Sequence, residues 1–233
     1  MKLYKVGGCV RDQLLGISSK DIDYSVEAKS YAEMREELLA RGCKIYLEKP
    51  EYLTIRGKLN NEDVDFVLCR KDGAYSDGRR PDEVTIGTIY DDLARRDFTI
   101  NAIAIDEDGN YIDPFNGRKD LEDRIIRCVG SNDRLKEDAL RILRAYRFCI
   151  TKGFDLEESI KEEVFEYWSL LDNISEERIT QELNKCFESS VEHTMYTIAV
   201  RHEFFGRYLF EMCDRRGIKF NTKFYPDQAK KTF

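Results

Sequence analysis

Hydrophobic and polar positions divide the chain into two unlike halves. Up to about residue 130, short runs of β-branched and aromatic residues predict strands, and residues 30–42 predict a helix that ends at Gly42. The predicted strands are LYKV, IDYSV, YLTIRG, VDFVLC, AIAID and IIRCVG. From Asp133 onward strand signals fade, and helical periodicity follows in residues 134–150, 156–171 and 175–189. The first half is therefore predicted to be α/β and the second half helical.

Two residues mark the ends of the predicted C-terminal helices. Gly153 ends the first of them as a left-handed cap, and Ser175 is placed to cap the start of the third. Beyond residue 190 the chain mixes aromatic and basic residues and finishes in QAKKTF. We expect this ending to be a solvated tail that need not be ordered.

Composition narrows the class of protein. With 233 residues, 42% of them hydrophobic and 36% charged, the chain has enough apolar material for one ordinary core and a smaller appended unit. A net charge of -7 argues against a protein that coats nucleic acid through a global positive field. Any RNA contact must therefore come from local basic patches. Because no apolar run approaches the ~20 residues that span a bilayer, we expect no membrane segment.

Cysteine and histidine usage points to carboxylate chemistry in a reducing compartment. The seven cysteines form no CxxC pair, which is typical of reduced thiols in a cytosolic protein, so we expect a cytoplasmic location. His193 and His202 lack the neighbours that a zinc site needs, and they give poor support to zinc chemistry or a Ser-His-Asp triad. We therefore expect catalysis, if there is any, to use carboxylates.

Three acidic residues are candidate ligands for a hard divalent cation. Asp21 and Asp23 alternate along a predicted strand, so their side chains emerge on one face. Asp65 supplies a third acid on another predicted strand, with Asp63 as a weaker candidate on the same face. If the two strands are neighbours, the carboxylates converge. Taken alone, the DID triplet is a weak signal, and the polar start of a strand explains it better.

A glycine pair precedes these acids. Gly7 and Gly8 follow the first predicted strand and open a helix, where small residues let a polyphosphate approach backbone N–H groups. Arg11 falls in the first turns of that helix and is suited to a phosphate or an acid, while Asp12 complements the helix N-terminus. An isolated glycine pair would also serve as an ordinary tight turn.

Several motifs in order now identify a family resemblance. GGCVRD followed by DID resembles the signature of the DNA polymerase β nucleotidyltransferase superfamily, in the branch of bacterial-type tRNA nucleotidyltransferases (CCA-adding enzymes) and poly(A) polymerases. DGAYSDGRRPDEVTIGTIYDDLARRDFTINAIA resembles the family's flexible loop and its RRDFTINA motif. IDPFNGRKDLEDRIIRCVG and EDALRILRAYRF resemble the segments that follow, the last being the nucleotide-selecting helix. The resemblance covers roughly residues 5–150.

The resemblance implies an α+β fold in three parts. These are a nucleotidyltransferase catalytic head at 1–130 with a small mixed β-sheet flanked by helices, an all-helical neck at 131–173 with the selecting helix, and a short helical body at 174–233. The implied reaction is template-independent addition or repair of the 3′-terminal CCA of tRNA from CTP and ATP, with release of pyrophosphate. Two Mg²⁺ ions would be held by the catalytic acids, with Asp21 and Asp23 as metal ligands and Asp65 as the third carboxylate.

Two other functions stay open at this point. Poly(A) polymerases share most of these motifs, so RNA adenylyl transfer is the nearest alternative. A catalytically inactive RNA-binding module is a further alternative, although the intact Asp21, Asp23 and Asp65 oppose it. The oligomeric state is not indicated by any pattern in the sequence.

A helical pair is the candidate for base selection. Asp138 and Arg141 are three residues apart on a predicted helix, so they can present an acceptor beside a fork of donors. Cytosine and adenine both offer an amino group next to an unprotonated ring nitrogen. The resemblance assigns selection to this pair, with Glu137 orienting the arginine and Arg144 nearer the phosphates or the interior. A solvated helix face with surface ion pairs is the alternative.

The ARRDFTINA segment is the candidate for holding the sugar and triphosphate. The resemblance gives this role to Arg96, Asp97 and Asn101, and the Asn101 amide is suited to a ribose hydroxyl. Asp97 and Thr99 are equally placed to cap a short helix. Residues 72–90 hold glycines, a proline and two arginines, which is typical of a loop over a cleft. The resemblance implies that this loop helps the change from C to A addition.

The C-terminal region leaves two readings open. Relatives usually continue into longer helical domains that hold tRNA, and beyond about residue 190 no alignment is found, so the grip on tRNA is the least defined part. The basic residues there, with Phe and Tyr between them, could contact RNA; they are Arg201, Arg207, Arg215, Arg216, Lys219 and Lys223. The spacing of the aromatic residues is equally consistent with a core; these are Phe204, Phe205 and Tyr208, with Leu209.

Overall fold

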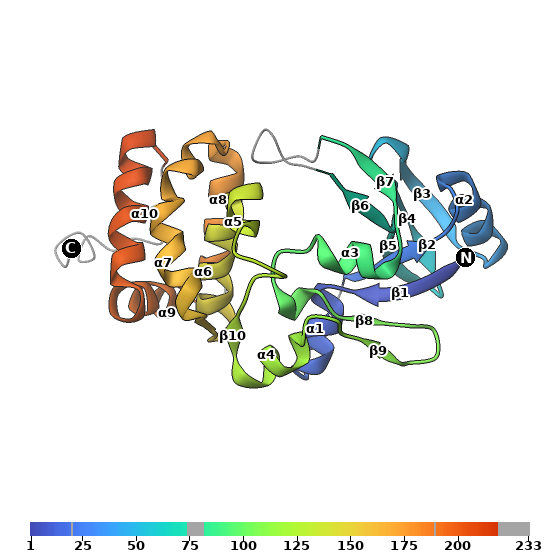
Figure 1. The fold of residues 1–233 in the computed structure, drawn as a ribbon, viewed down its shortest axis with the longest axis horizontal. Coiled ribbons are helices and arrows are strands. Elements are labelled where there is room, and N and C mark those ends of the chain that lie inside the picture. Colours follow the sequence, from blue (N-terminus) through green and yellow to red (C-terminus); the bar gives the residue numbers. More distant parts are fainter. Residues whose placement is uncertain (20, 74–81, 189, 219–233) are drawn as a thin grey trace. The chain divides into compact units, whose positions relative to one another are not determined.

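The computed structural model describes residues 1–19, 21–73, 82–188 and 190–218 (Figure 1). The chain forms two compact units, which we call unit 1 (Met1–Glu137) and unit 2 (Asp138–Phe233). Unit 1 contains the mixed sheet with helices, and unit 2 is built almost entirely of helices. The α+β class expected from the sequence is therefore confirmed.

A seven-stranded sheet is the centre of unit 1. Its strand order is β3-β4-β5-β2-β1-β8-β9. The strands are β1 (Lys2–Val6), β2 (Ile22–Glu27), β3 (Lys44–Lys49), β4 (Thr54–Leu59), β5 (Glu62–Leu68), β8 (Ala104–Ile105) and β9 (Tyr111–Ile112). Only β2 and β5 run parallel, and the other neighbours are antiparallel. Outside this sheet, β6 (Arg70–Asp72) pairs with β7 (Val84–Ile86), and β10 spans Ile125–Ile126.

Helices cover both faces of the sheet. The helices of unit 1 are α1 (Gly8–Leu14), α2 (Tyr31–Ala40), α3 (Ile89–Ala94), α4 (Gly117–Asp123) and α5 (Arg134–Glu137), with 3-10 turns at Pro50–Tyr52 and Thr99–Asn101. Met34 and Leu38 of α2 pack in one core cluster with Val26 of β2. On the opposite face, Leu93 of α3 packs with Val6 of β1. Alternation along β1 and β2 thus sends successive side chains to two different cores.

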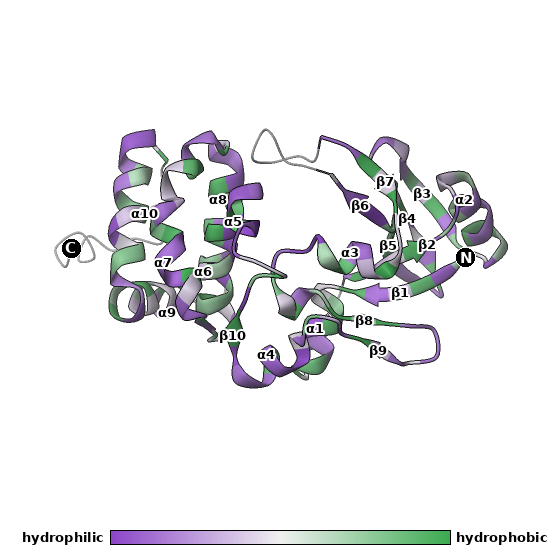
Figure 2. Ribbon diagram, in the orientation of Figure 1, coloured by the Kyte–Doolittle hydropathy of each residue, from purple (hydrophilic) through white to green (hydrophobic). Residues whose placement is uncertain are grey.

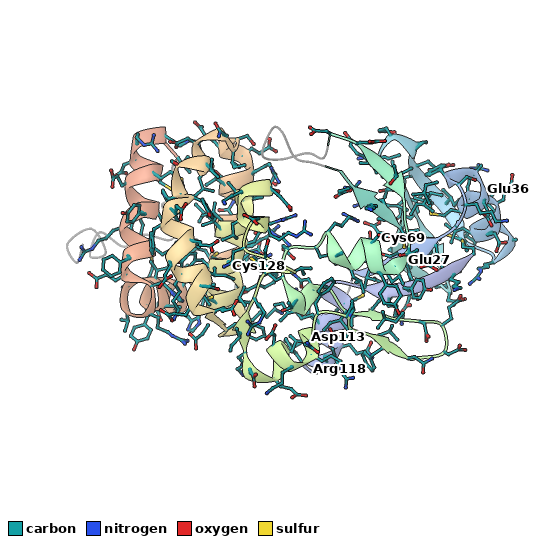
Figure 3. The ribbon with its side chains drawn as sticks, in the orientation of Figure 1. Glu27, Glu36, Cys69, Asp113, Arg118 and Cys128 are labelled. Atoms are coloured by element: carbon teal, nitrogen blue, oxygen red, sulfur yellow. The ribbon has the colours of Figure 1, made fainter. Side chains whose placement is uncertain are left out.

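Side-chain caps fix where several of these helices begin. Ser30 accepts a hydrogen bond from the backbone N–H of Glu33 at the start of α2, and Thr88 forms a capping box with Asp91 at the start of α3. Asp113 accepts from the backbone N–H groups of the first two residues of α4, at 2.7 and 3.0 Å, and it is labelled beside that helix in Figure 3. One or two of the orphan donors at each of these helix starts are therefore satisfied.

Unit 2 packs its helices around stacked aromatic rings. Its elements are β11 (Asp155–Leu156), α6 (Leu140–Lys152), α7 (Glu158–Glu166), a 3-10 helix (Trp168–Asn173), α8 (Glu176–Phe187), α9 (Val191–Tyr196), a π-helical turn (Thr197–Arg201) and α10 (Glu203–Arg216). The rings of Tyr146 and Phe205 stack with centroids 3.7 Å apart, and Trp168 meets Phe205 edge-on at 5.8 Å. Figure 2 shows hydrophobic and hydrophilic residues alternating along α6 and α10, as expected for helices with one buried face.

The prediction of one helix over residues 134–150 is wrong. The segment divides into α5 and α6 at Asp138. One Asp138 carboxylate oxygen accepts from the backbone N–H of Leu140 at 3.1 Å, so this residue forms a local turn just before Ala139, the N-cap of α6, instead of lying inside a helix. Gly153 does end α6 in the left-handed conformation. Ser175 stands at the N-cap position of α8, but its side chain makes no cap hydrogen bond.

Other differences from the sequence reading concern short or exposed elements. The predicted helix at 156–171 is α-helical only over α7 and then tightens to a 3-10 helix. Strand β3 was not predicted, because most of its residues are exposed and it has no buried side to show a pattern of period two. The longest helix of the described residues, α10, has 14 residues, and none is long and apolar enough to cross a membrane.

Candidate active site

The three candidate carboxylates surround one cavity in unit 1. Asp23 in β2 and Asp65 in β5 are direct partners in the parallel pair, so they stand side by side on the same face of the sheet. Asp21 comes just before β2. All three line a cavity of about 340 Å³. The other residues that line it are Ile22, Tyr46, Arg56, Asp63 and Val64.

The carboxylates share this cavity without forming a closed ligand cage. Within the described parts of the chain, no three His, Cys, Asp or Glu side chains come close enough together to hold a metal ion. Asp65 is instead paired with Arg56, with Nη2 and Oδ2 2.9 Å apart. Burial first, and then the charge of Asp65, raises the pKa of Asp23, against the lowering effect of Arg96.

This electrostatic situation suits a divalent cation. The pKa of Asp23 is raised because burial and the charge of Asp65 together outweigh the charge of Arg96. Carboxylate oxygens are the donors that Mg²⁺ prefers, and the cavity is large enough for hydrated ions. The residues present therefore fit the predicted metal, and its binding stays a prediction.

The predicted glycine turn lies against the carboxylates. Gly7 has φ +72°, a conformation that favours glycine, and it joins β1 to α1. A Cβ atom at Gly7 would lie 2.8 Å from Nη1 of Arg96 and 4.0 Å from Oδ2 of Asp23. Gly8 begins α1, and a Cβ there would be 3.6 Å from Nη2 of Arg11. The turn thus brings bare backbone beside one acid and two guanidinium groups.

A buried hydrogen-bond chain links three of the other predicted nucleotide-binding residues. Arg11 donates from Nη1 to Oδ1 of Asn101 at 2.8 Å, and Asn101 donates from Nδ2 to Oδ1 of Asp97 at 3.0 Å. Asp97 also accepts from the backbone N–H of Phe98, so it shapes the 3-10 turn at Thr99–Asn101. In this arrangement both ends of the Asn101 amide have partners. A contact from Asn101 to ribose stays a prediction.

Arg96 is held by a buried carboxylate that the sequence reasoning missed. Asp92 in α3 is completely buried and accepts from Arg95 at 2.6 Å, from Arg96 at 3.0 Å and from the Ser25 hydroxyl at 2.6 Å. Burial by itself raises the pKa of Asp92, but the charges of Arg96 and Arg95 outweigh it and lower that pKa to about 2. Because Ser25 is two residues from Asp23 on β2, this network fixes Arg96 beside the cavity.

A second link ties α3 to the same strand. Glu27 of β2 accepts from the backbone N–H of Ile89 at 2.6 Å and from the Tyr4 hydroxyl at 3.1 Å. Glu27 and Cys69 are labelled beside α3 in Figure 3. The DDLARR spacing, with Asp92 three and four residues before the two arginines, was the available signal for the Asp92 network.

The four residues predicted to select the base are divided between the two units. Glu137, at the end of unit 1, pairs with Arg134 at 2.7 Å. In unit 2, Asp138 accepts from Arg178 of α8 at 3.1 Å, and Arg141 is buried with its backbone N–H bonded to the Asp138 carbonyl. Arg144 lies 3.9 Å from Glu182. The selecting role of these residues stays a prediction. Asp138 lies in the break between α5 and α6 and not on a helix face.

The middle of the predicted loop at 72–90 falls outside the described residues. Residues 74–81, which include Arg79 and Arg80, are not described. On either side of them, β6 and β7 form an antiparallel hairpin.

The basic and aromatic residues near the C-terminus have several roles. Each described arginine of this group already has a partner within unit 2: Arg201 with Asp155, Arg207 with Glu203, Arg215 with Asp172, and Arg216 with the carbonyls of Leu171 and Ile174. Lys219 and Lys223 lie outside the described residues. Phe205 and Leu209 are core, whereas Phe204 and Tyr208 are 66% and 43% exposed. The two readings of the aromatic residues therefore apply to different residues.

Two family models match the chain. The poly(A) polymerase head domain matches residues 3–127. The model described as a probable RNA and SrmB-binding site of polymerase A matches residues 153–210, so the expectation that nothing aligns beyond about residue 190 is wrong.

Curated relatives and solved structures agree with these models. The CCA-adding enzyme of Streptococcus gordonii is 41% identical over 184 residues, which cover 78% of this chain and 45% of that enzyme. The enzyme of Lactococcus lactis is 39% identical over 202 residues, covering 86% and 50%. The chain thus spans about half the length of the curated relatives it matches.

Among solved structures, the Bacillus stearothermophilus CCA-adding enzyme in complex with CTP has a TM-score of 0.71 and 34% identity, covering 84% of this chain and 47% of that one. A tRNA nucleotidyltransferase complexed with a primer tRNA and an incoming ATP analog has a TM-score of 0.67 and 29% identity, covering 85% and 59%. The family resemblance expected from the motifs is confirmed.

Proposed function

The chain belongs to the family of the poly(A) polymerase head domain, and from this premise we propose that it is a template-independent nucleotidyltransferase that builds or repairs the 3′-terminal CCA of tRNA from CTP and ATP. One observation supports this most directly. Asp23 and Asp65 stand in register on one sheet face, inside a cavity next to the Gly7 turn and Arg96. The relatives named for CCA addition favour this reaction over poly(A) addition.

In the proposed mechanism the acids provide a cation site at the reacting atoms. Asp21, Asp23 and Asp65 would hold two Mg²⁺ ions. When bound, such ions lower the pKa of an RNA 3′-hydroxyl and neutralise charge on the departing pyrophosphate. The carboxylates also fix where the 3′ oxygen and the α-phosphate meet, since positioning provides much of the rate in phosphoryl transfer.

The side of the cavity formed by Gly7 and Arg96 would hold the triphosphate. The missing Cβ at Gly7 lets Nη1 of Arg96 lie close to the backbone of the turn, so phosphate oxygens bound there would meet the guanidinium group beside the backbone. Asp92 keeps the Arg96 guanidinium in place, so little side-chain entropy is lost when a nucleotide binds. Arg11, Asn101 and Asp97 form a rigid neighbouring chain for the sugar and phosphates.

Base selection would come from Asp138 and Arg141. A carboxylate accepts from the amino group of cytosine or adenine, and a guanidinium donates to the adjacent ring nitrogen. Uracil and guanine present a carbonyl beside an N–H, and the same pair would repel both. Glu137 and Arg144 are the neighbouring charges that would orient this pair.

The proposal is tested with tRNA that lacks its CCA end. We expect the 233-residue chain to add two C and one A when CTP and ATP are supplied with Mg²⁺, and to reject UTP and GTP. Long A tails from ATP alone would support poly(A) addition, the alternative to which the matching poly(A) polymerase head domain also points. If the purified chain adds no nucleotide to any RNA end, the proposed function is wrong.

A matched pair of variants tests the carboxylates. Asp23→Asn should lower incorporation by about a thousandfold or more, because several kcal/mol of charge stabilisation would be lost. Asp63→Asn changes another acid of the same cavity, but one that is 62% exposed in its side chain and lies 3.7 Å from Lys58. Asp63→Asn should retain most of the activity. Equal effects in both variants would contradict the assignment of Asp23.

A further inference from the structure

The cavity has a second side for which neither the motifs nor the relatives name a role. Across the sheet, β1 and the Gly7 turn lie on one side of Asp23, and β5, β4 and β3 lie on the other. On that other side the cavity is lined by Asp65 of β5, Arg56 of β4 and Tyr46 of β3. An aromatic ring and a guanidinium group therefore stand next to the third carboxylate.

A β-bulge brings the tyrosine to this position. The pairing of β3 with β4 jumps from Ile45 opposite Gly57 to Leu47 opposite Arg56, so Tyr46 is the extra residue. Bulges next to active sites commonly redirect a side chain. Tyr46 is 58% exposed, lines the cavity and hydrogen-bonds through its hydroxyl to Asp63. A large aromatic face is therefore held at the cavity mouth with little packed against it.

The cations of β4 balance the acids of β5 on this face. Arg56 stands opposite Asp65, and Lys58 stands opposite Asp63, with nitrogen to oxygen distances of 2.9 and 3.7 Å. The Arg56 side chain is 51% exposed, and its contact with Asp65 engages one nitrogen of a group that has five N–H donors. This side of an acidic cavity can therefore receive a phosphodiester without strong repulsion.

We propose that Tyr46 and Arg56 form the subsite for the 3′-terminal nucleotide of the RNA acceptor, with the base stacked on Tyr46 and its phosphate bound by Arg56. The inference rests on the proposed function. In an in-line displacement the attacking hydroxyl and the leaving pyrophosphate lie on opposite sides of the α-phosphate. If the triphosphate occupies the Gly7 and Arg96 side, the acceptor end approaches over β5, β4 and β3.

The chemistry of this pair matches what an acceptor subsite requires. The terminal base changes with each nucleotide added, so a subsite that reads one base would stop the reaction. Stacking on an aromatic ring tolerates any base, and a guanidinium group recognises phosphate irrespective of sequence. Tyr46 and Arg56 provide these two kinds of contact.

Substitutions of Tyr46 provide the first test. Binding of a fluorescent acceptor-stem RNA that lacks CCA is measured with the full chain, without NTP and with EDTA. We expect Tyr46→Ala to weaken binding about 5- to 150-fold, the range equivalent to 1–3 kcal/mol per stacked base. Tyr46→Phe keeps the ring and should bind like the unchanged chain. Tyr52→Ala is the matched control, because Tyr52 is 56% exposed and does not line the cavity.

Steady-state kinetics separate a stacking role from a structural one. Tyr46→Ala should raise KM for the RNA acceptor and leave KM for CTP nearly unchanged. A general disturbance of the site would raise both values. Thermal unfolding of Tyr46→Ala should match that of the unchanged chain, since the side chain is mostly exposed.

Salt dependence tests Arg56. Loss of one phosphate contact should reduce the slope of log affinity against log salt by about 0.7–1 in Arg56→Ala, whichever base ends the RNA. Arg56→Lys keeps the charge and should restore most of the slope. An RNA with 4-thiouridine as its last nucleotide should cross-link under ultraviolet light to the peptide that contains Tyr46.

The outcomes distinguish this inference from the proposed function. If the unchanged chain adds CCA but Tyr46→Ala and Arg56→Ala bind RNA as it does, the subsite is wrong and the function stands. If the unchanged chain adds no nucleotide but these variants still lose RNA affinity, the pair binds RNA, and both the function and the acceptor role are wrong. A cross-link confined to peptides outside residues 44–58 would also overturn the subsite.

Discussion

Unit 1 and unit 2 each bury a carboxylate among cations, but they use it differently. In unit 1, Asp92 is completely buried, and its partners Arg96 and Ser25 stand beside a cavity lined by acids. In unit 2, Glu182 of α8 is 4% exposed and accepts from Arg147 of α6 at 2.7 Å. The first network holds side chains at a site, and the second fastens two helices to each other.

The surroundings of the two networks sharpen this contrast. Near Asp92, the backbone of Gly7 lies beside Arg96 and Asp23 without a side chain of its own. Burial and the charge of Asp65 raise the pKa of Asp23. In unit 2, the described C-terminal arginines are already paired with acids or carbonyls of the same unit. A buried ion pair therefore indicates a functional site only when it borders a cavity whose acidic side chains are placed to bind a ligand.

Removing the buried acid of unit 1 should have the largest effect on stability. Asp92→Ala leaves Arg95 and Arg96 without their main partner, so we expect a loss of about 3–5 kcal/mol in the free energy of unfolding. Hydrogen exchange of the β2 and α3 amides measures this loss in unit 1. Trp168, the one tryptophan of the chain, is in unit 2, and its fluorescence transition should move much less. If hydrogen exchange and Trp168 fluorescence report the same loss of stability, the two networks do not stabilise their units separately.

Removing the buried acid of unit 2 should lower the free energy of unfolding by a smaller amount. Glu182→Ala releases Arg147 and Lys185, and the Lys185 side chain, which is 48% exposed, can be hydrated once it is released. The Glu182 side chain itself still reaches solvent at 5% exposure, whereas that of Asp92 is completely buried. We expect a loss of about 1.5–3 kcal/mol, as for a hydrogen bond to a charged group. Chemical unfolding followed by Trp168 fluorescence measures it. Glu177→Ala, on the same helix but exposed, is the control and should change stability by no more than ~0.5 kcal/mol.

Acid should weaken the two units in different pH ranges. Burial, then the charge of Arg201, lowers the pKa of His202 in unit 2 to about 4 from an ordinary 6.5. Between those values only the unfolded chain binds the proton, so the stability of unit 2 should fall as pH falls from 6.5. The pKa of Asp92 is depressed, so its contribution to the stability of unit 1 is fully present above the ordinary value of 3.8. That contribution is lost only as pH falls from 3.8 through about 2.

The effect of His202 protonation on stability can be measured separately from that of the carboxylates. Unfolding midpoints from Trp168 fluorescence are compared between pH 6.5 and 5, above the ordinary range of Asp and Glu. We expect the unfolding midpoint of the unchanged chain to fall between pH 6.5 and 5, and that of His202→Gln to change less over the same range. A decline of the same size in His202→Gln would show that another group causes it.

The smallest effect is expected at an exposed pair of unit 2. Arg207 is paired with Glu203 one turn away, and both side chains are more than half exposed. Arg207→Ala should change the free energy of unfolding by no more than ~0.5 kcal/mol. It should also lower RNA affinity less than Arg56→Ala, because binding RNA through Arg207 would first disrupt that pair. A loss of RNA affinity larger than that of Arg56→Ala would move the main phosphate contact into unit 2.

Local patterns predicted the strands that hold the acids. The alternation in IDYSV and VDFVLC gave β2 and β5, and these strands are neighbours, as the convergence of Asp23 and Asp65 required. The glycine pair predicted the turn into α1, because few other residues adopt the conformation of Gly7. Each of these signals depends only on residues near one another in the chain.

The residues that complete the candidate site could not be found in this way. Tyr46 reaches the cavity through a bulge in a strand without a buried face, and Arg56 faces Asp65 because β4 pairs with β5 in one register. Asp138 lies in the break between α5 and α6, and its carboxylate accepts from Arg178, forty residues away. Each depends on a partner distant in sequence.

The sequence by itself determined the family, the kinds of element and the chemistry of the acids, since motifs, hydrophobic period and residue type are properties of short segments. Only the tertiary structure decided which side chains share a cavity and which charges are already paired. Strand order and register bring Asp23, Asp65, Arg56 and Tyr46 together from three separate segments of the chain. Burial then sets the cost of an unpaired charge, and it depends on the whole fold around each side chain.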